Sequence, residues 1–214
     1  MKTNATLRAY LPFAVAIFNG LVALTILSAQ PNGSPDSLTK KGTTQSKSEY
    51  RKEAEAKGNM NGVNDFDFFI GHWCVHHRRL KERLAHNHDW EEFEGTSIAQ
   101  KILGGFGNMD DNVIELPSGA YRAVTFRTYD ASKQLWSIWW IDSRNPLHLD
   151  PPVVGRFENG VGTFYADDIF RGQPIRVRYL WMNLSTTPHW EQAFSGDRGK
   201  TWETNWTMDF TRIR

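Results

Sequence analysis

The chain has 214 residues, of which 40% are hydrophobic and 23% are charged, a composition typical of a globular protein with one folded domain and tails. Residues 65–214 carry 17 Lys and Arg residues against 20 Asp and Glu residues, a formal charge of −3. This balance argues against a nucleic-acid binder, which needs a basic face to meet phosphates. Cys74 is the only cysteine, which excludes an intramolecular disulfide and a structural cysteine zinc site.

The first 29 residues have the layout of a secretory signal or a membrane anchor. Lys2 and Arg8 precede the apolar run Leu11–Ala29, which ends on small residues suited to a cleavage site. The run is nearly long enough to cross a bilayer, so a retained membrane tether through residues 11–29 stays an alternative to cleavage. Both interpretations predict an exported protein whose folded part is periplasmic or extracellular.

Residues 30–64 are poor in large apolar side chains and rich in Ser, Thr, Lys, Glu, Gly and Asn. Such a segment cannot bury enough surface to offset its conformational entropy, so we interpret it as a flexible linker or tail. The predicted organisation is therefore a signal or anchor over residues 1–29, a linker over residues 30–64 and one folded domain over residues 65–214.

The folded domain is predicted to be all-β. Asp65–Gly71 suggests a short helical plug or an opening turn, and about nine or ten strand-like segments follow it without a long helix. Turns recur about every eight to twelve residues, which indicates antiparallel strands. The expected strands cover residues 73–84, 92–103, 112–116, 120–129, 134–142, 153–158, 161–165, 175–182, 189–194 and 201–211, with a glycine-rich loop over residues 103–112.

Many of these strands carry large side chains on both faces. This mixture favours a closed antiparallel β-barrel with a lumen, because the strands of a sandwich would each present one cleanly apolar face. The 9 Trp and 13 Phe residues supply aromatic groups for the interior. A barrel of this size encloses room for about one small molecule, so we expect a ligand cavity, and a two-sheet sandwich remains the alternative.

Several stretches resemble known barrels. Gly71-His72-Trp73, with Arg212 just after the last strand, resembles the calycin pattern, in which a Gly-x-Trp strand start packs against a basic residue near the closing strand. Over residues 65–214 the chain is also similar to a group of uncharacterised bacterial calycin-like proteins, related in fold to lipocalins and nitrobindins and described as a domain of unknown function. The similar stretches are Phe66–Trp73, His76–Leu84, Trp90–Gly95, Asp142–Arg144, Leu149–Phe157, Trp190–Ser195 and Thr201–Trp206. The resemblance implies a calycin barrel and no established activity.

The candidate ligand-binding residues are polar or aromatic side chains expected at the lumen or its rim. His77 and Arg79 share one face of the first strand, where Arg suits planar oxygen pairs and His can exchange a proton near neutral pH. Asp142 and Arg144 end the most aromatic strand, where loops gather at a barrel rim. The alternative for each of them is a solvent-facing or locally paired side chain.

Four more residues complete the set of candidate ligand-binding residues. Arg178 and Glu191 lie on neighbouring strands and are interpreted as a ligand clamp or a structural bridge. Trp139 and Trp206 are the tryptophans expected to line the pocket. The predicted ligand-binding residues are therefore His77, Arg79, Trp139, Asp142, Arg144, Arg178, Glu191 and Trp206.

These features predict an exported protein that binds a lipophilic or anionic small molecule, with no cofactor and no nucleic-acid partner, and they do not define its oligomeric state. One alternative is an isomerase or hydrolase on the same barrel, with His77, Glu191 or Asp142 as acid or base. Another is a nitrobindin-like haem binder, for which His189 is the candidate ligand.

Two local motifs are interpreted as structural. His86 and His88 lie in a polar loop without a third inward ligand, so no metal site is predicted. The segment Ser195–Trp202 resembles a single Asp-box, which predicts a hairpin turn in which Asp197 accepts hydrogen bonds from loop amides.

Overall fold

The computed structural model describes residues 60–214. The predictions of a signal or anchor and of most of the linker therefore lie outside the described residues. Within the described part of the chain, no helix is long and apolar enough to span a membrane.

Ten antiparallel strands close into one barrel, as the sequence predicts, and the sandwich alternative is wrong. The strands are β1 (Gly71–Leu80), β2 (Trp90–Ile102), β3 (Gly107–Leu116), β4 (Gly119–Asp130), β5 (Leu135–Asp142), β6 (Val153–Glu158), β7 (Val161–Phe170), β8 (Gln173–Met182), β9 (His189–Ser195) and β10 (Glu203–Arg212). Each strand pairs with its neighbour in the chain, and β10 returns to pair with β1. The barrel therefore has no free sheet edge.

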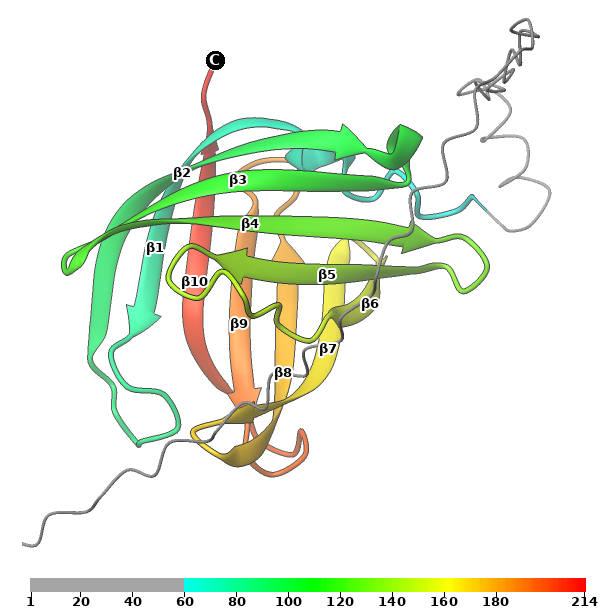
Figure 1. The fold of residues 1–214 in the computed structure, drawn as a ribbon. Helices are drawn as coiled ribbons and strands as arrows, with labels where there is room; N and C mark the ends of the chain where they lie inside the picture. Colours follow the sequence, from blue (N-terminus) through cyan, green and yellow to red (C-terminus); the bar gives the residue numbers. More distant parts are fainter. Residues whose placement is uncertain (1–59) are drawn as a thin grey trace, which may run out of the picture. The chain divides into compact units, whose positions relative to one another are not determined.

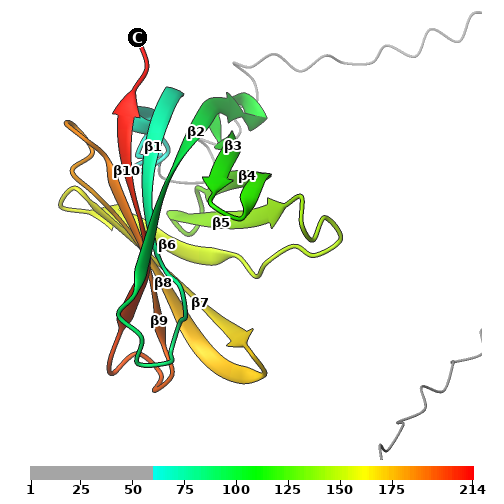
Figure 2. The ribbon, with the colours of Figure 1, turned by 90° about the vertical axis from the view of Figure 1, so that its left-hand side faces the viewer.

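The barrel is flattened into two layers. Strands β7 to β10 and β1 lie side by side along one axis, with neighbours pointing in opposite directions. Strands β3 to β5 cross this axis, and the curved strand β2 leads from one layer to the other (Figure 1). The view turned by 90° shows these layers apart from each other (Figure 2). Side chains that alternate along each strand point into the space between the layers, which is where the core and the cavity lie.

One end of the barrel is closed by the segment before β1. Residues 67–69 form a short 3-10 helix, η1 (Asp67–Phe69), so the predicted helical plug is present. Phe66 and Phe69 are each 1% exposed. The Phe66 ring meets those of Trp136 and Phe157 edge to face at 5.0 and 4.9 Å between centroids. This aromatic cluster stabilises the closed end.

The predicted contact between Trp73 and Arg212 is present. The Arg212 guanidinium lies 4.1 Å from the centre of the Trp73 ring and donates to the carbonyls of Ile70 and Phe68 at 2.8 and 2.6 Å. Trp73 Nε1 donates to the Phe69 carbonyl at 2.7 Å. The last strand thus holds the plug against the first strand.

Packing begins before residue 65. Val63 is buried, and Trp136 Nε1 donates to the Gly62 carbonyl at 2.9 Å. The Tyr129 hydroxyl donates to the Asn61 carbonyl. Residues 60–64, assigned to the linker from their composition, therefore belong to the packed barrel.

The predicted loop over residues 103–112 is wrong for most of its length. Only a short 3-10 turn, η2 (Leu103–Gly105), precedes β3, which begins at Gly107. The loop was predicted from the glycines at its start, and Asn108 and Asp110 add residue types that are depleted in strands. Both are buried and bind the same cation, Arg127, which explains why they stand in a strand.

Candidate functional site

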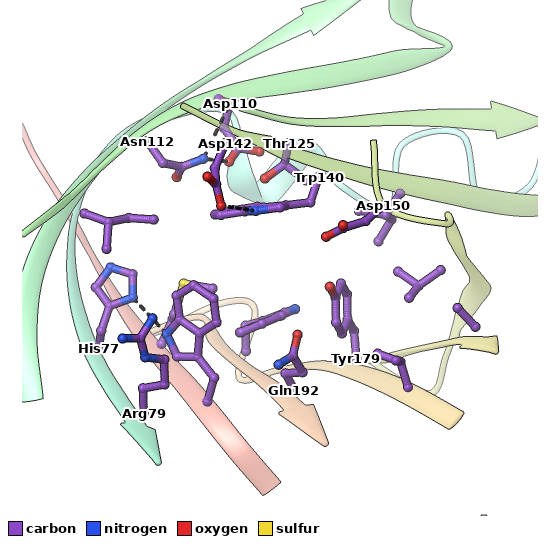
Figure 3. A pocket seen from close by; sticks show the side chains of 18 of the residues that line it. His77, Arg79, Asp110, Asn112, Thr125, Trp140, Asp142, Asp150, Tyr179 and Gln192 are labelled. Carbon is purple, nitrogen blue, oxygen red and sulfur yellow. Dashed lines mark hydrogen bonds between the residues drawn. The ribbon is translucent and has the colours of Figure 1, made fainter. Parts of the chain in front are cut away.

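A cavity of about 340 Å³ lies between the two layers of the barrel (Figure 3). Its walls combine aromatic rings, among them Trp140, Trp190 and Trp206, with polar side chains from both layers. At one end it is lined by Arg144 and Asp150, whose side chains are 51% and 46% exposed. The cavity therefore reaches solvent at this end, called the mouth below. The volume lies at the lower end of the range for small-molecule sites.

The inner end of the cavity contains a buried ion pair. The side chains of Arg127 on β4 and Asp110 on β3 are 4% and 3% exposed and are bonded to each other. Arg127 Nη1 also donates to Asn108 Oδ1 at 2.9 Å, and Asn112 Nδ2 donates to Asp110 Oδ2 at 2.6 Å. Arg127 Nε has no hydrogen-bond partner among residues 60–214. The two opposite charges therefore compensate each other, and the Nε–H group of Arg127 remains as a free donor at the inner wall among residues 60–214.

His77 lines the cavity as predicted, but in a neutral form. The side chain stacks on Phe93 at 4.8 Å between ring centroids, and its Nδ1 accepts a hydrogen bond from Trp206 Nε1 at 3.2 Å. The proton of the neutral ring therefore lies on Nε2. Burial, and after it the charges of His76 and Arg79, lower the pKa of His77 to about 3. The expectation that this residue exchanges protons near neutral pH is not supported.

This buried imidazole makes a prediction for stability. The unfolded chain binds a proton at His77 below about pH 6.5, whereas the folded chain does so only below about pH 3. Above pH 6.5 His77 is neutral in both states and does not affect stability. As the pH falls from 6.5 toward 3, the free energy of unfolding decreases, by at most about 1.4 kcal/mol per pH unit. In His77→Gln, which does not titrate, the free energy of unfolding by urea should fall less steeply between pH 6.5 and 4.

Phe93→Leu is the control for that measurement, because it weakens the packing around the imidazole without removing it. It should lower stability at every pH and retain the acid dependence of the wild-type protein. Equal slopes for His77→Gln and the wild type would show that His77 is not the group responsible.

Two predicted arginines lie at the cavity and are already paired. Arg79 donates to Glu91 Oε1 from Nη2 at 2.6 Å and from Nε at 3.1 Å. Arg144 forms a fork with Asp142, Nη2 to Oδ2 at 2.6 Å and Nε to Oδ1 at 3.1 Å. The hydrogen bonds from Arg144 lower the pKa of Asp142 and raise that of Arg144. Both side chains of this second pair line the mouth.

Arg83 also lines the cavity, although it is not among the ligand-binding residues predicted from the sequence. It lies in the loop after β1, beyond the end of the strand at Leu80. Its guanidinium is 5.7 Å from the Phe194 ring centre and 6.0 Å from that of Trp206. The alternation that places His77 and Arg79 on one face also reaches residue 83, so the signal was present.

Two further carboxylates line the cavity near Asp142. They belong to Asp150 and Asp168, and burial, followed by the charge of Asp168, raises the pKa of Asp150. Tyr179 lies beside them in the cavity, with its pKa raised by burial. In Figure 3, Asp142 and Asp150 stand on one side of the cavity, and His77, Arg79 and Gln192 stand on the other. Asp150 and Asp168 are called the acidic wall below.

Three predicted binding residues lie outside the cavity. Trp139 stacks on Phe126 at 5.1 Å, and the Arg178 guanidinium lies 4.6 Å from the Trp202 ring centre. Glu191 Oε1 is 3.3 Å from His189 Nε2. In each case the next residue lines the cavity instead, namely Trp140, Tyr179 and Gln192. Because strand side chains alternate, an error of one residue in the assignment of the faces accounts for all three.

The geometry does not favour either alternative function. Glu191 is outside the cavity, Asp142 is held by Arg144, and His77 is too weakly basic to act near neutral pH. His189, the candidate haem ligand, contacts Asp209 Oδ1 at 2.6 Å through its Nδ1 and does not line the cavity. Within residues 60–214, no group of three or more His, Cys, Asp or Glu side chains is placed to hold a metal ion.

The predicted turn at Ser195–Trp202 is confirmed. Asp197 accepts hydrogen bonds from the amides of Lys200 at 3.0 Å and Thr201 at 2.9 Å, and Trp202 Nε1 donates to the Gly199 carbonyl at 3.1 Å. These bonds lower the pKa of Asp197. All of the donors belong to the turn itself, so the motif acts here as a hairpin closure.

A comparison with protein-family models found no match to this chain, and a comparison with curated proteins found no significant relative. The barrel and its cavity are therefore the features that bear on function.

Proposed function

We propose that this protein binds one small amphipathic molecule in the lumen of its barrel. The observation that carries the proposal is the cavity itself, which has aromatic walls, a neutralised inner end and arginine side chains at a mouth that reaches solvent. The lining combines aromatic and polar side chains, which suits a molecule that has both an apolar and a polar part. A binding role is favoured over acid–base catalysis because the three candidate acids and bases do not meet at one point of the cavity.

We also propose that the barrel belongs among the calycin-like folds and that it works outside the cytoplasm. The ten-stranded antiparallel closure and the packing of Arg212 on Trp73 support the first part. The basic, apolar and small-residue order of residues 1–29 supports the second. Mass spectrometry of the protein after cell fractionation tests export. A chain shortened near Ala29, or a full-length chain in the membrane fraction, is expected, whereas a full-length chain in the cytosol contradicts it.

Filling the lumen should abolish binding. Ala166 on β7 lines the cavity, so Ala166→Trp places an indole where the ligand would lie. We use 2-naphthoate as the probe, because two fused rings and one carboxylate suit a space of about 340 Å³. Isothermal titration calorimetry should show one naphthoate per wild-type chain and at least about tenfold weaker binding to Ala166→Trp.

The matched control is Ala120→Trp, which adds the same indole at an exposed position of β4. It should bind naphthoate as the wild-type protein does. Circular dichroism verifies that both variants fold, with Ala166→Leu as a milder replacement if the larger one does not. Undiminished binding to a folded Ala166→Trp protein would mean that the probe does not occupy the lumen.

A further inference from the structure

Arg83 differs from the other arginines that line the cavity. Arg79, Arg127 and Arg144 each have a carboxylate partner, namely Glu91, Asp110 and Asp142. Within residues 60–214, no carboxylate lies within ion-pair distance of the Arg83 guanidinium. Instead, the guanidinium lies near the rings of Phe194 and Trp206.

This arrangement leaves hydrogen-bond donors unused. Ring contacts attract the positive charge, but they do not accept the N–H donors that a guanidinium presents in its plane. Burial, and after it the charge of Arg79, lower the pKa of Arg83 to about 10, so the side chain remains charged at neutral pH. A partly desolvated cation without an anion is costly, and a bound anion removes that cost.

We infer that Arg83 is the anion subsite of the cavity and that the ligand is a small aromatic monocarboxylate, bound with its carboxylate at Arg83 and its ring system against Trp206 and the aromatic wall behind it. This inference rests on the proposed function. A planar carboxylate matches the guanidinium fork, and flat rings match walls made of Trp and Phe side chains.

The acidic wall restricts the ligand further. Asp150 and Asp168 face the cavity at the mouth, and among residues 60–214 the ion-pair partner of Asp150 is His148 at 3.5 Å. A second negative charge on the ligand would be repelled by these carboxylates. Phosphate monoesters and dicarboxylates are therefore disfavoured, and a single carboxylate is favoured.

The test compares two probes that differ in charge. Calorimetry is performed with 2-naphthoate and with neutral 2-naphthylmethanol on the wild-type protein and on Arg83→Met, which keeps an apolar stem and removes the guanidinium. The wild type should bind naphthoate about tenfold more tightly than naphthylmethanol. Arg83→Met should lose this preference through weaker naphthoate binding and should bind naphthylmethanol within about twofold of the wild type.

Two further variants control for charge and for folding. Arg171→Met removes a positive charge from the β7–β8 turn at the same end of the barrel and should change naphthoate affinity by no more than about twofold. Arg83→Lys keeps the charge without the planar fork and should give an intermediate affinity. If Arg83→Met does not fold, the naphthoate affinity of Arg83→Lys is compared with that of the wild type instead.

The two proposals fail in different ways. Equal naphthoate affinity for wild type and Arg83→Met, with naphthylmethanol still bound in the lumen, overturns the anion subsite and leaves the proposed function standing. Failure of both probes to bind the wild-type protein overturns the proposed function and the subsite together.

Discussion

Replacing Asp110 with Leu should lower the free energy of unfolding by about 3–5 kcal/mol. The carboxylate of Asp110 is the ion-pair partner of Arg127, and both side chains are almost completely buried. Removing it leaves a guanidinium between the Phe66 and Phe69 rings, whose centres are each 5.1 Å from it, with no anion beside it. An unpaired buried charge is among the most destabilising changes a core can receive. Urea unfolding at neutral pH measures the effect.

The adjacent residue supplies a matched control. Asp111 also forms an ion pair with an arginine of β4, Arg122, but their side chains are 44% and 62% exposed. Asp111→Leu should therefore cost no more than about 1 kcal/mol. Similar losses for Asp110→Leu and Asp111→Leu would show that burial does not set the strength of these pairs.

A double replacement separates the pair from the lost charge. Asp110→Leu combined with Arg127→Met replaces both buried ions by apolar side chains, and it should recover most of the stability that Asp110→Leu loses. If the double variant is as unstable as the single one, the loss arises from packing or from Asn108 and Asn112 rather than from an unpaired guanidinium.

The second large effect is expected at the closed end of the barrel. Phe66→Ala should lower the free energy of unfolding by about 3–5 kcal/mol. The Phe66 ring is 1% exposed, and besides Trp136 and Phe157 its neighbours include Phe164 and Trp181, at 5.9 and 6.0 Å between centroids. Truncation leaves a void next to Arg127, in a place where the surrounding strands cannot collapse onto it. Thermal or urea unfolding measures the loss.

Phe126→Ala is the control for this change. Phe126 is half-buried on β4 and stacks on Trp139 outside the lumen, so its truncation leaves no enclosed void. We expect a loss well below that of Phe66→Ala. A larger loss at Phe126 would mean that the outer ring pair, and not the plug, dominates the stability of the barrel.

The barrel could be predicted from the sequence because its strands are short, numerous and separated by turn signals. The plug before β1 and the hairpin at Asp197 were predicted for the same reason, since both are local structures. The start of β3 could not be predicted. Asn108 and Asp110 are satisfied inside the barrel because both bind Arg127 of the next strand, and no local pattern carries that information.

The candidate site was predicted in part. His77, Arg79, Asp142, Arg144 and Trp206 line the cavity, while Trp139, Arg178 and Glu191 lie outside it. In a barrel with large side chains on both faces, hydrophobicity does not tell the inner face from the outer one. The alternation that starts at His77 and Arg79 also reaches Arg83, although β1 ends at Leu80 and the loop after it places this side chain at the cavity.

The central claim is that the lumen is the binding site, and ¹⁹F NMR tests it most directly. With 5-fluorotryptophan incorporated, Trp140, Trp181, Trp190 and Trp206 report from the cavity, and Trp139 and Trp202 report from outside it. Titration with 2-naphthoate should shift or broaden the four cavity resonances and leave the two outer ones unchanged. Perturbation confined to Trp139 and Trp202, or no perturbation at saturating probe, would contradict the claim.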